Sequence, residues 1–326
     1  MKNNAPKLTV VGGTYIDLAL RCNQIPAPGQ RVTGSSIAFS PTGPGTIQAV
    51  QAALCGCDVY LISKVGDCPF GSLLKDALSE HNINTDYVFT AKAKHTGAFI
   101  TLVDSAGENA SCSYVGANSA LTPREVESAE QTIADSEICL LHGWLPEDAI
   151  CTAIKLAKLH STKLILNPAR PLTPQNNKNE TEIPLDYFTA DILIANLYEA
   201  AQIIDQSTAG IKTAKLIGSD LVARGVKTAV ITMGKRGCMV VDRSSADHIP
   251  AFEVDLVNKT ARGDAFAGAL AAYCAVKDDV REAAKFAAAA GALTCTKFGA
   301  VESLPSKQEI IQMLQQQDFE RPSSYQ

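Results

Sequence analysis

The sequence has few aromatic residues and no long apolar run. Only 6% of its 326 residues are aromatic, and one of these is tryptophan. A platform of aromatic side chains that stacks on nucleic-acid bases is therefore not expected. No apolar segment approaches the roughly 20 residues of a membrane-spanning helix, and the first residues, MKNNAP, lack the apolar core of a secretory signal. We expect a cytoplasmic protein that binds neither a membrane nor nucleic acid.

The chain also lacks an excess of basic residues. Lys and Arg number 29 against 34 Asp and Glu, so the formal net charge is −5. This balance argues against nucleic acid as the main partner, although small anions bind local features rather than net charge. With 46% hydrophobic and 19% charged residues, the composition is that of a globular protein. The length allows a large core, or two smaller ones.

Cysteine and histidine show no metal-binding spacing. The ten cysteines are scattered, no CxxC pair occurs, and the five histidines do not cluster with them. The closest pair, Cys55 and Cys57, is typical of small buried thiols. We therefore expect free thiols and no zinc site.

Three common nucleotide or nucleophile motifs are absent. There is no G-x-x-x-x-G-K-[ST] sequence and no G-x-S-x-G sequence. After the first expected strand, Gly12-Gly13 is followed by Thr14 and Tyr15, so the G-x-G-x-x-G pattern of dinucleotide-binding proteins is missing too. A P-loop enzyme, an α/β-hydrolase and a dinucleotide-dependent oxidoreductase are not supported.

Short apolar segments alternate with helix-like segments along most of the chain. We expect strands at 8–11, 58–63, 138–141, 163–166, 192–194 and 228–232. We expect helices at 48–54, 71–78, 147–159, 197–204, 213–224, 264–276, 280–296 and 306–314. This alternation predicts an α/β fold with a mostly parallel central sheet and helices on both faces.

Two regions break the alternation. Residues 31–40 and 97–115 are strand-like, with no helix between the strands of each region. They predict a small β-sheet lid, made from about residues 14–45 and 96–118, beside the end of the main sheet. We expect the whole chain, residues 1–326, to form one domain with this lid inserted. Residues 171–183 are expected to be a polar loop, and the polar tail 315–326 is expected to fray.

The segment that best fits a chemical role runs from Thr260 to Asp264. A turn of small residues leads into an alanine-rich helix, whose first N–H groups are unpaired and favour an anion such as a phosphoryl group. A carboxylate in that turn can accept a proton from a substrate hydroxyl. The simpler interpretation is that Asp264 is only the N-cap of the helix.

Two further segments follow expected strands. Asn196 and Glu199 lie three residues apart, where their oxygens could hold Mg²⁺ directly or through water, or could simply cap a helix. The turn after the strand ending at Thr232 contains Gly234 and Gly237. It could bring its backbone close to a nucleotide, or it could be an ordinary hairpin.

Taken in order, these segments resemble the ribokinase-like (PfkB) family of carbohydrate kinases over about residues 8–312. The matching segments are 12–17, 25–29, 42–50, 64–67, 70–71, 116–118, 166–169, the pair Asn196 and Glu199, the turn 232–237, and 260–264. The segment 42–50, TGPGTIQAV, aligns with the family's G-G-K-G-A-N-Q-A-V signature, and 260–264 aligns with its second signature around the catalytic aspartate.

The resemblance implies a ribokinase-like three-layer α/β sandwich and an activity. We expect ATP-dependent phosphorylation of a hydroxyl on a small sugar or sugar-like substrate, with ATP and Mg²⁺ as cofactors and a homodimer formed through the lid.

The resemblance also assigns a role to each matching residue. Asp264 is the base, with Ala261, Arg262 and Gly263 in the anion hole; Asp17, Gly43, Gly45, Ile47, Asn118 and Trp144 bind the substrate; Asn196, Thr232, Gly234 and Gly237 bind the nucleotide; Asn196 and Glu199 hold the metal; Asn258 and Ser303 mark a monovalent cation site.

Several residues depart from the family pattern. Ile47 stands where the family has an asparagine that contacts the sugar, so the pocket should be less polar there. Asn258 replaces an aspartate that helps to hold a monovalent cation, so that site should be weakened. Trp144 either stacks on a substrate or belongs to the core. Arg262 replaces a small residue and either points to solvent, contacts a phosphate, or obstructs the nucleotide.

These departures leave two alternatives to a sugar kinase. A nucleoside kinase of the same fold would turn Trp144 and Ile47 toward a base. A catalytically weakened nucleotide- or sugar-binding protein would explain why Ile47, Asn258 and Arg262 all fall within the two signature regions. The retention of Asp17, Asn196, Glu199 and Asp264 argues against the second alternative.

Overall fold

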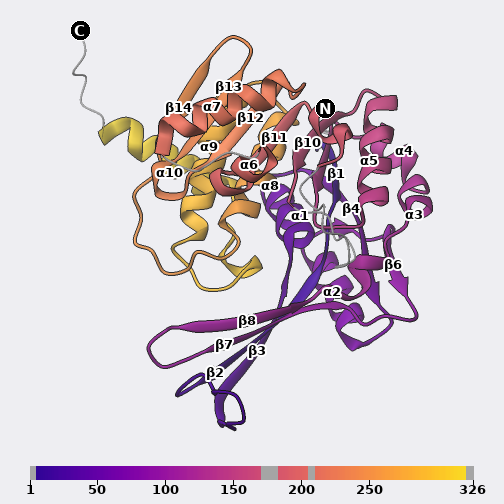
Figure 1. The fold of residues 1–326 in the computed structure, drawn as a ribbon, viewed down its shortest axis with the longest axis vertical. Coiled ribbons are helices and arrows are strands. Elements are labelled where there is room, and N and C mark those ends of the chain that lie inside the picture. The colour runs from indigo at the N-terminus through magenta and orange to yellow at the C-terminus, as the bar shows by residue number, and fades with distance from the viewer. Residues whose placement is uncertain (1–4, 170–182, 205–209, 321–326) are drawn as a thin grey trace.

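The structure is a computed structural model, and it describes residues 5–169, 183–204 and 210–320. A large sheet lies between two layers of helices, and a small second sheet extends away from this body (Figure 1). The predicted α/β sandwich with a mostly parallel central sheet and a smaller separate sheet is confirmed.

The larger sheet has ten strands within the described residues, in the order β14-β13-β12-β11-β10-β9-β1-β4-β5, and β6 also pairs with β4. Its strands are β1 (Lys7–Val11), β4 (Asp58–Gly66), β5 (Ile83–Asn84), β6 (Val88–Ala91), β9 (Ile138–His142), β10 (Lys163–Asn167), β11 (Ile192–Asn196), β12 (Thr228–Thr232), β13 (Cys238–Asp242) and β14 (Ala246–Ile249). All neighbours pair in parallel except β12–β13 and β13–β14. The carboxyl ends of the parallel strands therefore share one edge, where α/β proteins bind their ligands.

Helices cover both faces of this sheet. The α-helices are α1 (Pro44–Leu54), α2 (Pro69–Glu80), α3 (Pro123–Glu127), α4 (Glu130–Ala134), α5 (Glu147–Leu159), α6 (Leu197–Ile203), α7 (Gly210–Ala223), α8 (Arg262–Cys274), α9 (Val280–Thr294) and α10 (Lys307–Glu320). The short 3₁₀ helices are η1 (Gly116–Ala120), η2 (Leu185–Thr189), η3 (Gly234–Arg236) and η4 (Val301–Ser303). Among the described residues, no helix is both long and apolar enough to cross a lipid bilayer.

Alternate side chains of the strands point into different cores, as a pleated sheet requires. Leu8 and Val10 pack with α1, α8 and α9 on one face, whereas Val11 packs with α3, α4 and α5 on the other. A third cluster joins the β11–β13 end of the sheet to α6 and α7. The alanine-rich sequences of α8 and α9 allow close packing against each other and the sheet, because most of their buried side chains are single methyl groups.

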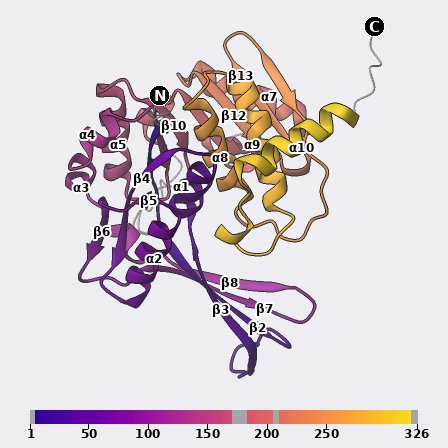
Figure 2. The ribbon, with the colours of Figure 1, turned by 180° about the vertical axis from the view of Figure 1, so that it is seen from behind.

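The small sheet is the predicted lid. Its strands, in the order β3-β2-β7-β8, are β2 (Tyr15–Cys22), β3 (Gly34–Thr42), β7 (Gly97–Val103) and β8 (Asn109–Tyr114). Seen from behind, these strands again extend as one ribbon away from the helices (Figure 2). Because side chains alternate between the two faces, Asp17 and its neighbour Phe99 share one face, while Leu18 and its neighbour Ile100 share the other.

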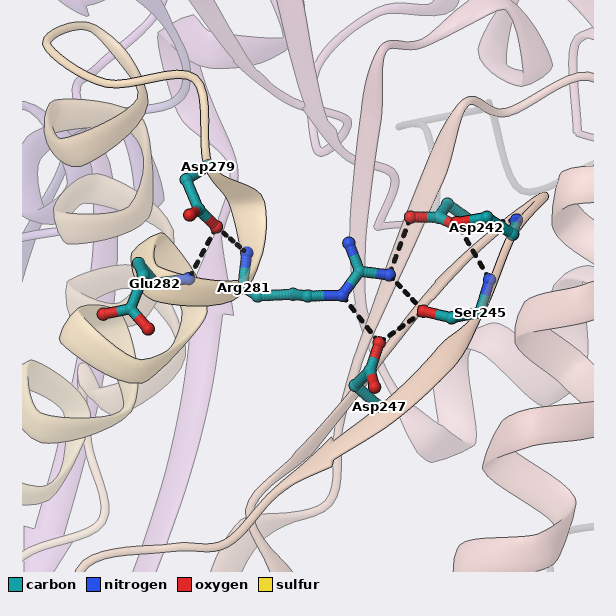
Figure 3. Close-up of polar contacts among 7 residues, drawn as sticks. Asp242, Ser245, Asp247, Asp279, Arg281 and Glu282 are labelled. Atoms are coloured by element: carbon teal, nitrogen blue, oxygen red, sulfur yellow. Dashed lines mark hydrogen bonds and ion pairs between the residues drawn. The ribbon is translucent and has the colours of Figure 1, made fainter.

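An arginine network fastens the antiparallel edge of the large sheet to α9 (Figure 3). Arg281 donates through Nε to Asp247 Oδ2 at 2.6 Å and through Nη2 to Asp242 Oδ2 at 2.8 Å, and it also contacts Ser245 Oγ. Asp279 caps α9 by accepting the backbone N–H of Arg281 at 3.1 Å. Hydrogen bonds from Ser244 and from Arg281 hold the pKa of Asp242 far below its usual range. These contacts hold the hairpin of β13 and β14 against the start of α9.

Several elements differ from the sequence predictions. Strands β5, β6, β13 and β14 and helices α3 and α4 were not predicted, and helices α3 and α4 are only five residues long. Helix α10 continues to Glu320, so the predicted fraying of 315–320 is wrong; glutamine and glutamate are good helix formers. The predicted loop 171–183 falls, up to residue 182, outside the described residues, as does the end of the tail, 321–326. All ten cysteines lie in the described part of the chain and are free thiols, as predicted.

Candidate active site

Helix α8 begins without a side-chain cap. Ala261 precedes it in the left-handed conformation, with φ 65° and ψ −13°, and no side chain of the described residues accepts a hydrogen bond from the first turn. A Cβ atom on Gly263 would meet no atom within 4 Å, so these N–H groups are open to an anion. The interpretation of Asp264 as the N-cap is wrong, because the helix begins two residues earlier, at Arg262.

Asp264 is the third residue of α8 and is half-buried. Its Oδ1 accepts a hydrogen bond of 2.8 Å from Nε2 of Gln48 on α1. Burial raises the pKa of Asp264 from 3.8 to about 6; the bond from Gln48 opposes this rise and the nearby charge of Glu199 adds to it. A carboxylate with a pKa near neutrality suits a general base, because it is ionised at neutral pH yet accepts a proton readily.

Asn196 and Glu199 form a capping box at the start of α6. Asn196 Oδ1 accepts the N–H of Glu199 at 2.9 Å, and Glu199 Oε2 accepts the N–H of Asn196 at 3.1 Å. The capping interpretation is thus confirmed. The second carboxylate oxygen of Glu199, Oε1, takes no part in the capping box. Burial raises the pKa of Glu199, and its charge acts on Asp264. The box therefore lies near the start of α8.

The turn after β12 lies beside Asn196. Thr232 ends that strand and pairs in register with Asn196 on β11. Gly234 and Gly237 then adopt positive φ angles of 61° and 80°, and β13 returns antiparallel. The hairpin interpretation is confirmed for the backbone, and the two glycines let the turn fold tightly at the carboxyl edge of the sheet.

Arg262 points from α8 across this turn. A Cβ atom on Gly234 would lie 3.5 Å from Nη2 of Arg262. The side chain is exposed, and no side-chain hydrogen bond or ion pair to it occurs among the described residues. The side chain of Arg262 therefore lies against the turn, and its contact with a phosphate stays a prediction.

On the lid, Asp17 lies between two side chains of β7. Its Oδ1 accepts a hydrogen bond of 3.0 Å from Thr101 Oγ1, and Phe99 is its direct neighbour across the strands. Burial raises the pKa of Asp17, and the charge of Glu302 near the C-terminal end of the chain adds to this rise. The Asp17 face of the lid is therefore turned toward the body.

An aromatic cluster joins this face to the loop after β9. The ring of Trp144 stacks on Tyr15 with centroids 5.2 Å apart and an angle of 16°, and it lies 6.0 Å from the ring of Phe99. Tyr15 is fully buried, and its hydroxyl has no hydrogen-bond partner in the part of the chain that the structure describes. Trp144 is half-buried, so part of its side chain faces solvent while its ring packs on Tyr15.

Glycines make room for this cluster. Gly43 has φ 97°, and a Cβ atom there would lie 2.5 Å from Cδ2 of Tyr15. A Cβ atom on Gly45 would lie 2.5 Å from the carbonyl carbon of Gly12, and its N–H donates to Gly13 O at 2.9 Å. The start of α1 thus packs directly on the turn after β1.

Two predicted substrate residues have other contacts. Ile47 is 3% exposed and packs in the apolar core. Asn118 is fully buried; its Oδ1 accepts Thr14 N–H at 3.0 Å, and its Nδ2 donates to Thr14 O at 2.8 Å and to Val115 O at 3.1 Å. Asn118 therefore fixes the start of the lid, and a direct substrate contact of either residue stays a prediction.

The segments of the predicted cation site lie together. Asn258 Nδ2 donates to Gly299 O at 3.2 Å, and its Oδ1 accepts the N–H of Thr260 at 3.0 Å. Ser303 is fully buried and donates to Ala300 O at 2.8 Å. Asn258 is uncharged and carries an amide donor, and its side chain links the segment at Thr260 to the loop at Gly299.

Comparison with known proteins decides the family. The sequence matches the pfkB family carbohydrate kinases over residues 5–307. The chain belongs to this family. It is 30% identical over 308 residues to a ribokinase of Haemophilus influenzae, covering 94% of this chain and 98% of that one, and 31% identical over 310 residues to a ribokinase of Bacillus subtilis, covering 94% and 99%. Ribokinase of Arabidopsis thaliana, solved with ribose and ATP, superposes with a TM-score of 0.86 at 23% identity, covering 95% and 99%.

The predicted family, fold and class of activity are thereby confirmed. The protein is a ribokinase-like carbohydrate kinase, which catalyses the ATP-dependent phosphorylation of a sugar hydroxyl.

The structure adds residues of this pfkB kinase that the sequence analysis did not single out. Gln48 bonds to Asp264, Thr101 bonds to Asp17, and Tyr15 and Phe99 surround Trp144. The sequence carried one signal for Gln48, a polar residue among mostly apolar residues of α1, and Gln51 carries the same signal. The others depend on the strand pairing of the lid, which the sequence leaves open.

Proposed function

We propose that the enzyme transfers the γ-phosphoryl group of ATP to a hydroxyl of a furanose-like sugar, with Asp264 as the base. Asp264 accepts the hydroxyl proton, the substrate oxygen forms a bond to the γ-phosphorus, and the bond to the β–γ bridging oxygen breaks, so that ADP leaves. The uncapped N–H groups of Ala261, Arg262, Gly263 and Asp264 stabilise the charge on the phosphoryl oxygens. The observation that carries this proposal is a base with a pKa near 6 within an uncapped helix start.

The nucleotide would bind along the carboxyl edge of β11 and β12. The turn with Thr232, Gly234 and Gly237 offers close backbone approach, and Asn196 lies beside it in register. Glu199 and Asn196 provide hard oxygen donors for Mg²⁺, which takes one or two carboxylates and fills its other positions with water and phosphate oxygens. Among the described residues no group of three or more His, Cys, Asp or Glu could hold a metal, which fits an ion held largely by the nucleotide.

The sugar would bind between the lid and the loop after β9. Asp17 would accept hydrogen bonds from sugar hydroxyls, while Trp144 and Phe99 would pack on an apolar face of the ring. Gly43 and Gly45 would let the start of α1 pack closely on Tyr15 and Gly12 next to this site. Ile47 and Asn118 would shape this pocket through packing rather than through direct bonds to the sugar.

The aromatic cluster also favours a second candidate, a nucleoside kinase, because Trp144 and Phe99 could stack on a base. A panel of D-ribose, 2-deoxy-D-ribose, D-fructose, adenosine and uridine, assayed by ADP release with ATP and Mg²⁺, separates the two. We expect a free sugar to give the highest kcat/KM. A nucleoside preferred over every sugar would replace the proposal, and ATP binding without any turnover would favour the weakened binding protein.

We also propose a homodimer formed through the lid. The face opposite Asp17 carries large apolar side chains that are about half exposed, and the register of the strands brings them together: Ile37, Phe39, Ile100 and Tyr114. A contiguous apolar face of this kind on a thin sheet is typical of a protein interface. The sheet also has free edges at β3 and β8, which a second copy would cover.

The single-domain organisation of residues 1–326, a weakened response to monovalent cations and a cytoplasmic location stay predictions from the sequence. For the cation, the support is Asn258, whose side chain already bridges Thr260 and Gly299.

A further inference from the structure

Helix α1 buries two glutamines, and they have different partners. Gln48 and Gln51 are both 0% exposed, although burying an amide is unfavourable unless it is hydrogen-bonded. Nε2 of Gln51 donates to Pro305 O at 3.0 Å and to Cys55 Sγ at 3.4 Å, so it ties α1 to the segment before α10. Nε2 of Gln48 instead donates to Asp264 Oδ1 at 2.8 Å, across 216 positions of the sequence.

Close packing of two helices fixes the place of Gln48. A Cβ atom on Gly268 would lie 2.5 Å from the backbone oxygen of Gln48 and 2.9 Å from Cβ of Gln51. Helix α8 therefore contacts α1 at its backbone, one turn after Asp264. Oε1 of Gln48 is buried and has no partner among the described residues, so the amide is held by this packing and by its bond to Asp264.

We propose that Gln48 is a positioning residue for the catalytic base: it fixes one oxygen of Asp264 and so presents the other oxygen, Oδ2, to the acceptor hydroxyl. The inference rests on the proposed role of Asp264. Within the described residues, the bond from Gln48 is the one side-chain hydrogen bond to that carboxylate. Without it the carboxylate would turn about its last torsion, and the reacting oxygen would lose its fixed place.

The same bond acts on the charge of Asp264. A donor to a carboxylate favours the ionised form, and here it opposes the effects of burial and of Glu199, which raise the pKa. The groups that act on the carboxylate are Gln48 from α1 and Glu199 from α6. Loss of the donor therefore moves the pKa of Asp264 further upward.

The test compares Gln48→Met with Gln51→Met, which removes the same amide from the same buried helix but not from the base. The ionisation of Asp264 is followed by ¹³C NMR of its carboxyl carbon, assigned by its absence in Asp264→Asn, with no substrate present. We expect the midpoint to rise by about one pH unit in Gln48→Met and to stay in place in Gln51→Met, which changes only the melting temperature.

Turnover provides the second readout, measured with the best sugar of the panel above. We expect kcat of Gln48→Met to fall about tenfold at pH 8, where Asp264 is largely ionised, and further at pH 6, with the KM for ATP unchanged. In an Asp264→Asn background the Gln48→Met change should reduce residual turnover no further, because the group it positions is gone.

An unchanged midpoint and unchanged kcat in Gln48→Met would overturn the role of Gln48, and so would equal effects in Gln51→Met. This failure differs from failure of the proposed function, in which Asp264→Asn itself keeps wild-type turnover. If Gln48→Met does not fold, Gln48→Glu keeps the shape of the side chain. A carboxylate at this position has no proton to donate to Asp264, so we expect at least a tenfold loss of kcat at pH 9, where both groups are ionised, and wild-type kcat there would overturn the proposal.

Discussion

Replacing Asp264 with asparagine should greatly slow turnover and, near neutral pH, raise the free energy of unfolding. Burial raises the pKa of this carboxyl from 3.8 to about 6, even though Gln48 donates a hydrogen bond to it. The environment that makes Asp264 a useful base is thus unfavourable for its charged form. Asparagine has nearly the same shape and no charge, so it removes the base and this unfavourable charge together.

The sign of the stability change follows from the two protonation equilibria. The unfolded chain releases the proton near pH 3.8 and the folded protein near pH 6, so between these values the folded state binds more protons. The contribution of Asp264 to the free energy of unfolding therefore falls as the pH rises through this window and stays low above it. A pKa difference of this size corresponds to about 3 kcal/mol, and partial exposure to solvent reduces the expected gain in Asp264→Asn to about 1–2 kcal/mol at pH 8.

Urea unfolding at pH 8 and pH 4 measures the stability, and ADP release measures the turnover. We expect Asp264→Asn to be more stable than wild type at pH 8, equal to it at pH 4, and slower by about 10²–10⁴-fold. The wild-type kcat/KM should fall to half of its plateau near pH 6 and to about a tenth at pH 5. Asp76→Asn, the same substitution at an exposed position of α2, is the control and should change neither quantity.

Two results would refute this reasoning. If Asp264→Asn retains wild-type turnover, Asp264 is not the base. If it loses turnover but is less stable than wild type at pH 8, the carboxylate contributes to the fold, and its burial does not raise its pKa as described.

Four further substitutions test the same geometry, and the last of them tests the assembly state. Trp144→Ala should raise the KM for the sugar about two- to tenfold, because an aromatic contact is lost, and should leave the KM for ATP unchanged; an effect on ATP alone would contradict the placement of the sugar. Arg262→Ala should raise the KM for ATP about tenfold, since one charge-assisted contact is removed, and tighter ATP binding would instead identify Arg262 as an obstruction. Asn258→Asp should increase activation by K⁺ over Na⁺ relative to wild type, and equal activation of both proteins would contradict the weakened cation site. Ile100→Ser should shift the protein from dimer to monomer in analytical ultracentrifugation while its circular dichroism is retained; a wild-type monomer would exclude the lid dimer.

The order of the active-site segments was predictable from the sequence. Asn196 and Thr232 each end an apolar strand, and parallel neighbours end at the same edge, so both had to lie together once the α/β alternation was recognised. The turn before α8 was also visible, since small residues precede a long alanine-rich helix. The position of its first residue was not, because Asp264 is a good cap by type while Ala261 adopts the left-handed conformation instead.

The contacts across the lid and between helices were not predictable. Phe99 lies beside Asp17 only through the register of β2 with β7, and a shift of one residue would move it to the opposite face. The direction of Arg262 toward Gly234 depends on how α8 meets the turn after β12. Asn118 appeared to be free for a substrate, whereas its amide bonds to the backbone of Thr14.

The sequence by itself determined the class of fold, the family and the residues that end each strand, because these depend on local periodicity and on short motifs. Only the tertiary structure decided which of those residues act on each other. The bond from Gln48 to Asp264 joins residues 216 positions apart, and the rings of Tyr15, Phe99 and Trp144 meet from three separate segments. The ionisation of a base and the walls of a pocket arise from such long-range packing, since burial and hydrogen bonds depend on neighbours in space and not on neighbours along the chain.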